Sequence, residues 1–140
     1  MSARAKTFLQ AIAERPQVFD GAMGTMLYES GVFINTCYDE LCLTRSTLVR
    51  EIHRRYVEAG ADVITSNSFG ANRLKLGAFG LASSTEAINA AAVELARAEA
   101  GDELFVAGSV GPCSGNRQVF ADEAIPEVRA AFAEQIGALV

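Results

Sequence analysis

The stretch Tyr56-Val57-Glu58-Ala59-Gly60-Ala61-Asp62-Val63-Ile64-Thr65 contains a helix end, a turn and a strand, and it decides the fold. From about Ser46 to Ala59, apolar residues recur at helical spacing with charged residues between them, which predicts an amphipathic helix. Gly60 stands where a helix favours a left-handed C-terminal cap, and the β-branched run Asp62 to Thr65 follows closely. We therefore predict a helix, a short turn and a buried strand in direct succession.

Strand-like runs that end in small residues occur twice more. Gln17 to Phe19 runs into Asp20-Gly21-Ala22-Met23-Gly24-Thr25, and Leu104 to Ala107 runs into Gly108-Ser109-Val110-Gly111-Pro112. The three strands recur at a spacing of roughly 43 residues with helices between them, which is the order of successive βαβ units in a parallel sheet. A closed eight-stranded barrel needs about 250 residues. We therefore expect an α/β chain that holds the first three βα units of a (β/α)8 TIM barrel, incomplete here, with an open doubly wound sheet as the alternative.

Further helices are predicted around these units. Ser2 can cap a short first helix that carries Phe8, Leu9 and Ile12, and Pro16 stops it. Residues 28–43 show no clear periodicity, so we predict a long irregular segment there. Residues 72–81 resemble a helical turn broken by Gly77 and Gly80. Ser83 and Glu86 form a capping-box pattern before a helix that Gly101 closes. The buried stripe of that helix is expected at Ile88, Ala91, Ala92 and Leu95.

The last predicted helix starts near Pro126 and runs to the last residue of the sequence. Its expected apolar face consists of Val128, Ala131, Phe132, Ile136, Leu139 and Val140. No cap, glycine or strand follows Val140, so we expect the natural protein to continue beyond it. Residues 1–140 would then be the N-terminal portion of a larger barrel domain.

Composition narrows the class of protein. The 140 residues are 50% hydrophobic, and 12 basic against 17 acidic residues give a formal net charge of −5. Without a basic cluster, a nucleic-acid partner is not expected. No apolar run approaches the roughly 18 residues of a membrane span, and the N-terminus lacks the apolar core of a signal peptide. We predict a cytoplasmic protein without a membrane partner, whose three cysteines are reduced.

The three strand-end loops are the candidate site, because parallel α/β folds place ligands at the C-terminal ends of their strands. Glycines in these loops let backbone amides approach a ligand closely, and polar side chains lie among them. Asp20 is the single acid that we place in the site, since Asp62 opens its strand at the opposite end. The alternative for each loop is that its small residues only turn the chain. Our candidate binding residues are Asp20, Gly21, Ala22, Met23, Gly24, Thr25, Asn67 and Ser109.

Other chemistry-bearing residues have plainer interpretations. The sequence lacks the spacing of dinucleotide or phosphate-binding motifs. Cys37 and Cys42 are five residues apart and Cys113 is distant, so we interpret them as packing thiols and assign no metal ligand in this chain. His53, the single histidine, is expected on the solvated face of its helix. Asp39 and Glu40 are expected in a solvated loop, with a place at the rim of the site as the alternative.

Four motifs in order resemble the N-terminal part of homocysteine S-methyltransferase domains. They are Asp20-Gly-Ala-Met-Gly-Thr25, Ile52-His53 with Glu58-Ala-Gly-Ala-Asp62, Ser66-Asn-Ser-Phe-Gly-Ala-Asn72 and Ala107-Gly-Ser-Val-Gly-Pro112. The resemblance covers about residues 16–140, and Phe33-Ile-Asn-Thr-Cys-Tyr-Asp-Glu-Leu41 is most similar to bacterial members fused to a methylenetetrahydrofolate reductase. It implies a (β/α)8 barrel that methylates homocysteine to methionine.

The resemblance also implies a cofactor and a set of substrate contacts. Family members hold zinc through three cysteine thiolates, and the metal lowers the pKa of the homocysteine thiol so that its thiolate attacks an activated methyl group. Those cysteines lie in later motifs, none of which contains Cys37, Cys42 or Cys113. The Asp20 loop is expected to hold the amino-acid end of homocysteine, with Asn67 and Ser109 lining the same mouth. The methyl donor is not specified, because methylated folate, methylcobalamin, S-methylmethionine and betaine-like donors all occur in the family.

We therefore expect a zinc-dependent homocysteine S-methyltransferase as the complete protein, of which this chain holds part of the homocysteine site and is inactive alone. Two alternatives stand beside it. One is a non-catalytic half-barrel that folds only with a complementary chain. The other is an unrelated small-molecule-binding domain built on an open α/β sheet.

Overall fold

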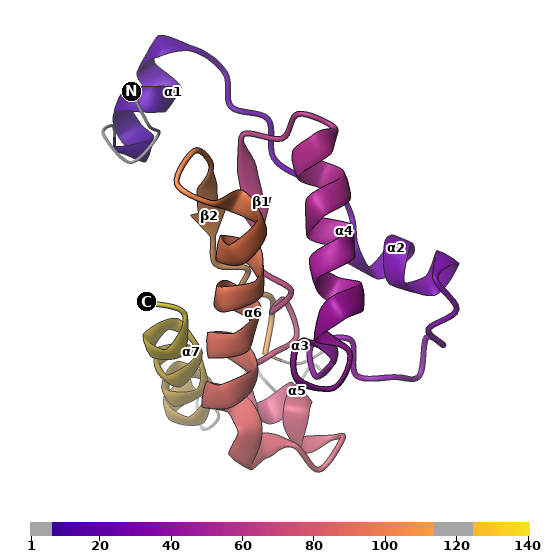
Figure 1. Ribbon diagram of the computed structural model, residues 1–140. Helices are drawn as coiled ribbons and strands as arrows, with labels where there is room; N and C mark the ends of the chain where they lie inside the picture. Colours follow the sequence, from indigo (N-terminus) through magenta and orange to yellow (C-terminus); the bar gives the residue numbers. More distant parts are fainter. Residues whose placement is uncertain (1–6, 114–124) are drawn as a thin grey trace.

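The computed structural model describes residues 7–113 and 125–140, and Figure 1 shows the arrangement of their helices and strands. The helices before the first strand are α1 (Phe8–Glu14), α2 (Met23–Glu29), α3 (Leu41–Thr44) and α4 (Ser46–Glu58). The remaining elements are β1 (Val63–Thr65), α5 (Arg73–Gly77), the 3-10 turn η2 (Ala82–Ser84), α6 (Thr85–Ala100), β2 (Phe105–Ala107) and α7 (Ile125–Leu139). The chain is thus a mixed α/β structure, and none of the described helices is long and apolar enough to cross a membrane.

The sheet is parallel, as the strand-helix order predicts. β1 pairs with β2 in the register Val63–Phe105, Ile64–Val106 and Thr65–Ala107. The predicted first strand at Gln17 to Phe19 is reduced to one parallel bridge, between Phe19 and Val63. That segment still lies along β1, because the Val18 carbonyl accepts from the amide of Val63 over 3.1 Å. The three segments are therefore neighbours in sequence order, with β1 in the middle.

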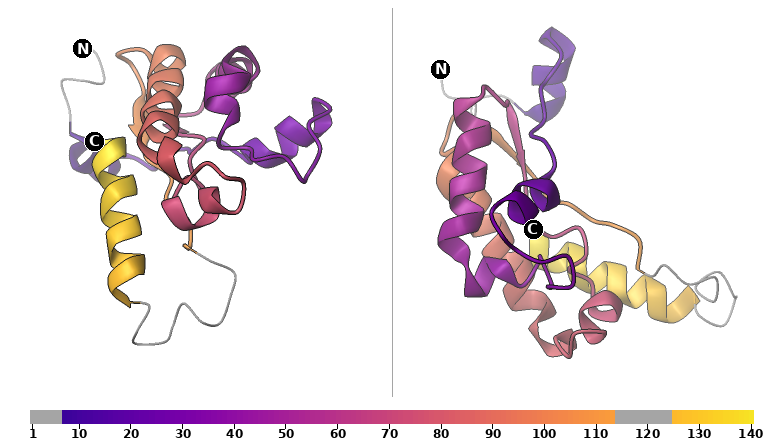
Figure 2. Two further views of the ribbon diagram at one scale, coloured as in Figure 1. Left: turned by 90° about the horizontal axis from the view of Figure 1, so that it is seen from below. Right: turned by 90° about the vertical axis from the view of Figure 1, so that its right-hand side faces the viewer.

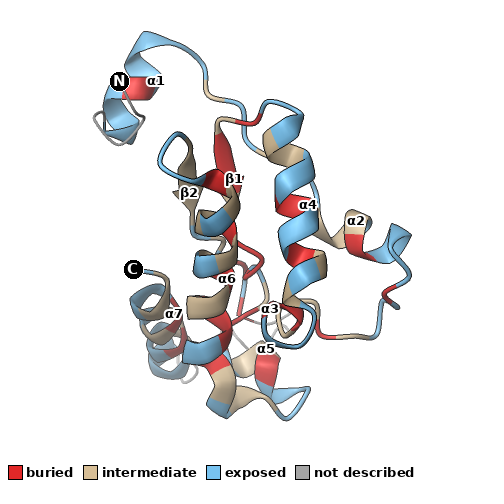
Figure 3. Ribbon diagram, in the orientation of Figure 1, coloured by how far each residue is buried: buried red, intermediate tan, exposed pale blue. Residues whose placement is uncertain are grey.

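The central joint of the fold is correctly predicted. α4 ends at Glu58, Gly60 has a φ of 94°, and β1 begins three residues later. Ile64 is fully buried against Ala61, Ala96 and Ala100 in the core between the sheet and α6. In Figures 1 and 2, α6 lies between α4 and α7, and it contacts both helices as well as both strands. Figure 3 shows the result, a buried β1 covered by helices that expose their outer residues.

The N-terminal helix begins later than predicted. Thr7 caps α1 in a capping box with Gln10, whereas Ser2, the predicted cap, lies outside the described residues. The ring of Phe8 lies edge-on to those of Phe19 and Phe105, with centroids 6.3 and 5.3 Å away. α1 therefore covers the strand starts, and it ends before Pro16 as expected.

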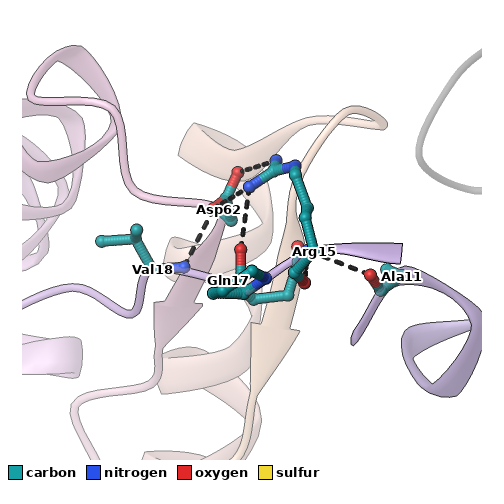
Figure 4. Close-up of polar contacts among 6 residues, drawn as sticks. Ala11, Arg15, Gln17, Val18 and Asp62 are labelled. Carbon is teal, nitrogen blue, oxygen red and sulfur yellow. Dashed lines mark hydrogen bonds and ion pairs between the residues drawn. The ribbon is translucent and has the colours of Figure 1, made fainter. Parts of the chain in front are cut away.

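An ion pair fixes the segment between α1 and the sheet, as Figure 4 shows. The guanidinium of Arg15 donates to both carboxylate oxygens of Asp62, over 2.6 and 2.9 Å. The amide of Val18 donates to the same carboxylate over 2.9 Å. Asp62 thus holds the first strand segment against β1 at the end of the sheet away from the candidate loops, which agrees with its exclusion from the site.

Two predicted helix details are wrong. Ser83 and Glu86 form no capping box, because residues 82–84 make the 3-10 turn η2 and α6 then begins at Thr85 without a side-chain cap. On α7, Ile136 is 50% exposed and Val140 fully exposed, although both were assigned to its apolar face. α7 packs mainly against α5 and α6, and its buried residues are Ala131 and Gln135.

Candidate functional site

A pocket of about 500 Å³ opens where β1, β2 and the Phe19 segment end. This volume suits a small metabolite. The predicted loops form its wall together with two residues from the stretch before α3. The lining residues are Asp20, Gly21, Ala22, Met23, Gly24, Tyr38, Asp39, Thr65, Ser66, Asn67, Ser68, Phe69, Gly70 and Ser109. The structure therefore brings together seven of the eight candidate residues, and the exposed Thr25 lies outside the wall.

Asp20 is held at the strand end by the backbone of β1. Its amide donates to the Val63 carbonyl over 3.0 Å, and its Oδ2 accepts from the amide of Thr65 over 2.9 Å. Oδ1 is buried and has no hydrogen-bond partner within the described residues. A buried carboxylate oxygen without a partner is unfavourable unless a bound group satisfies it. Asp20 thus lines the pocket with a carboxylate whose orientation the β1 backbone fixes.

The residues after Asp20 turn tightly over α4. A Cβ atom on Gly21 would lie 2.8 Å from the hydroxyl oxygen of Tyr56, so glycine allows this close approach. The same hydroxyl donates to the carbonyl of Ala22 over 3.3 Å. α2 then begins at Met23, which the sequence did not predict, and it places Gly24 near the ring of Tyr38.

Serine hydroxyls join the second and third loops. Ser66 and Ser68 share a hydrogen bond of 2.7 Å between their Oγ atoms. Ser68 Oγ also donates to the carbonyl of Ser109 over 2.8 Å, and the amide of Ser109 donates to Ser66 Oγ over 3.0 Å. Asn67 Nδ2 donates to the carbonyl of Tyr38 over 2.8 Å. The same Nδ2 atom also donates to Cys42 Sγ over 3.6 Å, so the Asn67 side chain ties the second loop to α3 and to the segment before it.

Asp39 is a pocket residue, which corrects its assignment to a solvated loop. Its Oδ1 accepts from the amide of Gly70 over 2.8 Å, and burial raises the pKa of its carboxyl group. A Cβ atom on Gly70 would lie 2.6 Å from Asp39 Oδ2, so the two residues are in close contact. Glu40 does not line the pocket. The sequence of residues 28–43 has no periodic pattern from which the position of Asp39 could be predicted, because the part of this segment that lines the pocket is irregular.

The prediction for His53 is also wrong, because its side chain is fully buried and not on a solvated helix face. Both ring nitrogens are buried and have no hydrogen-bond partner within the described residues. Burial lowers the pKa of the imidazole, against the opposing effects of Asp20 and Glu99. α4 contacts α6, α2, α3 and β1, so its buried surface is wider than a one-sided amphipathic helix would have.

The cysteines are packing thiols in the part of the chain that the structure describes. Cys37, Cys42 and Cys113 are all buried and free. Burial raises the pKa of Cys42 to about 12, whereas metal binding and nucleophilic attack require the thiolate. No three His, Cys, Asp or Glu residues among those described are placed to hold a metal ion.

Comparison with known proteins identifies relatives of this chain by sequence and by structure. The chain is 37% identical to a methionine synthase from Mycobacterium leprae and 35% identical to one from Mycobacterium tuberculosis, in both cases over 74% of this chain and 10% of the relative. Two solved structures of the homocysteine methyltransferase MmuM from Escherichia coli are also similar, each at 25% identity. The metallated form has a TM-score of 0.75, over 94% of this chain and 52% of that one. The oxidized form has a TM-score of 0.78, over 96% and 53%.

The chain thus spans about a tenth of the length of these curated relatives and about half of the solved chains. The sequence model of one family, described as homocysteine S-methyltransferase, matches residues 17–140. Those residues include every loop of the pocket. The chain therefore belongs to the homocysteine S-methyltransferase family.

Proposed function

We propose that the complete protein is a zinc-dependent homocysteine S-methyltransferase, which transfers a methyl group from an activated donor to the homocysteine thiol and yields methionine. In this proposal the present chain supplies part of the homocysteine site. The observation that carries it is the pocket itself, whose wall consists of the loops that bear the family motifs. The methyl donor stays open.

The pocket residues suggest how the amino-acid end of homocysteine would be held. Asp20 and Asp39 carry the two carboxyl groups of the wall, and Oδ1 of Asp20 has no partner within the described residues. A substrate ammonium would satisfy that oxygen with a charge-assisted hydrogen bond. The amides around Gly21 and Gly24 would meet the substrate carboxylate, while Asn67 and Ser109 line the same pocket.

The described residues do not fit the zinc of the proposed activity. They contain no suitable ligand cluster, and their cysteines are buried, protonated thiols. We therefore assign the metal to parts of the domain other than residues 7–113 and 125–140. Homocysteine is held here by its amino and carboxylate groups, and its thiol would be recognised elsewhere. This division also agrees with the proposal that the chain is inactive alone.

The proposal includes the architecture of the complete domain. Residues 1–140 would be the N-terminal portion of a (β/α)8 barrel and provide its first three βα units. Parallel pairing of three chain segments in sequence order supports this. So does the match of nearly the whole chain to about half of each MmuM structure.

Isothermal titration of the full chain with L-homocysteine tests the substrate assignment. We expect saturable binding, and we expect N-acetyl-homocysteine not to bind, because acetylation removes the ammonium that faces Asp20. Asp20→Asn should weaken binding at least about tenfold, since a hydrogen bond to a charged group contributes roughly 1.5–3 kcal/mol.

Glu51→Gln is the matched control, because it removes one carboxylate from the exposed side of α4. Its affinity for homocysteine should equal that of the unchanged chain. Absence of homocysteine binding at millimolar concentration would refute the assignment of the pocket. Equal binding of homocysteine and its N-acetyl derivative would refute the role of the carboxylates.

A further inference from the structure

One side chain of α7 reaches the wall of the pocket from outside it. Gln135 is fully buried, and its Nε2 atom donates to the carbonyl of Ser68 over 2.7 Å. A longer contact of 3.4 Å joins the same Nε2 atom to Oδ1 of Asn89 on α6. The next residue toward the N-terminus, Glu134, points instead to Arg73, with which it forms an ion pair at the surface. Gln135 thus connects α7 with the loop after β1.

Ser68 is the centre of the hydrogen bonds that join two loops of the pocket. Its hydroxyl contacts Ser66 Oγ and the carbonyl of Ser109, and its amide donates to the Ser66 carbonyl over 2.9 Å. The carbonyl of Ser68 also accepts from the amide of Ala71 over 3.0 Å. Gln135 therefore acts on a residue whose orientation fixes both the second and the third loop.

Burying a glutamine at this position carries a cost to the stability of the fold. Its Oε1 atom is buried without a partner in the described part of the chain. An unsatisfied buried amide oxygen is unfavourable, and an apolar side chain of similar volume would avoid it. What an apolar side chain cannot provide is a donor directed at the Ser68 carbonyl. The directed donor is thus the property that distinguishes glutamine here.

We propose that Gln135 is a positioning residue for the substrate pocket, which holds the Ser68 peptide so that Asn67 and Ser109 face the amino-acid end of homocysteine. This inference rests on the proposed function of the pocket. It assigns α7, which contributes no residue to the pocket wall, a part in ligand binding.

The test compares Gln135→Met with Glu134→Gln in the full chain. Methionine keeps the length of the side chain and removes the donor, whereas Glu134→Gln removes the neighbouring surface ion pair. We expect Gln135→Met to raise the Kd for L-homocysteine about tenfold, because a hydrogen bond that orients the loop is lost. Glu134→Gln should change this Kd less than twofold. Thermal unfolding and circular dichroism are measured on the same samples.

The outcomes separate the two proposals. If the unchanged chain does not bind homocysteine, the proposed function fails. If it binds and folded Gln135→Met binds equally well, the positioning role fails, even when the variant unfolds at a lower temperature, since that is the result of a purely structural role. Should Gln135→Met not fold, Ser68→Ala tests the next step, because it removes the hydroxyl that joins Ser68 to the Ser109 carbonyl and keeps the backbone carbonyl that Gln135 contacts. Unchanged affinity in Ser68→Ala would then overturn the inference.

Discussion

Gly111 provides a sharp test of how tightly the pocket loops are packed. Its amide donates to the carbonyl of Phe69 over 3.0 Å. In Gly111→Ala the new methyl carbon would lie 2.5 Å from that same carbonyl oxygen, and 2.8 and 2.9 Å from two atoms of the Phe69 ring. The ring can rotate away, but the carbonyl belongs to the backbone, so one of the two loops must move.

The expected cost follows from these contacts. Overpacking in a buried site costs about 1–3 kcal/mol, and loss of the amide hydrogen bond adds about 0.5–1.5 kcal/mol. We therefore expect Gly111→Ala to lower the free energy of unfolding by about 2–4 kcal/mol, measured by urea denaturation. Homocysteine binding should weaken as well, because Phe69 lines the pocket.

Gly137→Ala is a control with the same chemical change and the opposite expected sign. Gly137 lies inside α7, and a Cβ atom there would have no neighbour within 4 Å. Replacement of a helical glycine by alanine should stabilise the chain by about 0.5–1 kcal/mol. If both variants change the free energy of unfolding by less than about 0.5 kcal/mol, the packing described for the pocket loops is incorrect.

Two further predictions concern ionisable groups. Hydrogen bonds from Arg15 hold the pKa of Asp62 at about 2, below its ordinary value of 3.8, so the stabilisation is complete above that value and is lost as the pH falls through about 2. Asp62→Asn should remove this pH dependence. Equal slopes of Tm against pH in both proteins between about pH 4 and about pH 2 would contradict this role of Asp62. Burial raises the pKa of all three cysteine thiols, and that of Cys42 to about 12. Iodoacetamide at neutral pH should therefore modify the folded chain far more slowly than the urea-unfolded chain, as mass spectrometry would show, whereas similar rates would mean that the thiols are exposed.

The elements that the sequence predicts well are those that local chemistry specifies. Helical spacing of apolar residues locates α4 to within a residue, and Gly60 has the left-handed conformation that its cap position requires. The strands are short, but their apolar, β-branched composition and regular recurrence are sufficient to predict a parallel sheet. Sequence patterns do not predict the burial of residues whose environment is determined by tertiary contacts. His53 stands beside Arg54 and Arg55 in the sequence, yet the packing of α4 against several other elements buries it completely.

The candidate site follows the same division. Three loops could be predicted because each continues a strand, and parallel strands bring their C-terminal ends to one edge. Asp39 and Tyr38 belong to no strand, so no periodic pattern relates them to that edge. They reach the pocket through specific bonds instead, from the Gly70 amide to Asp39 and from the Asn67 side chain to the Tyr38 carbonyl. Residues that reach a site through such long-range bonds can be found only from a structure. The bond from Gln135 of α7 to the Ser68 carbonyl, behind the pocket wall, is equally invisible in the sequence pattern.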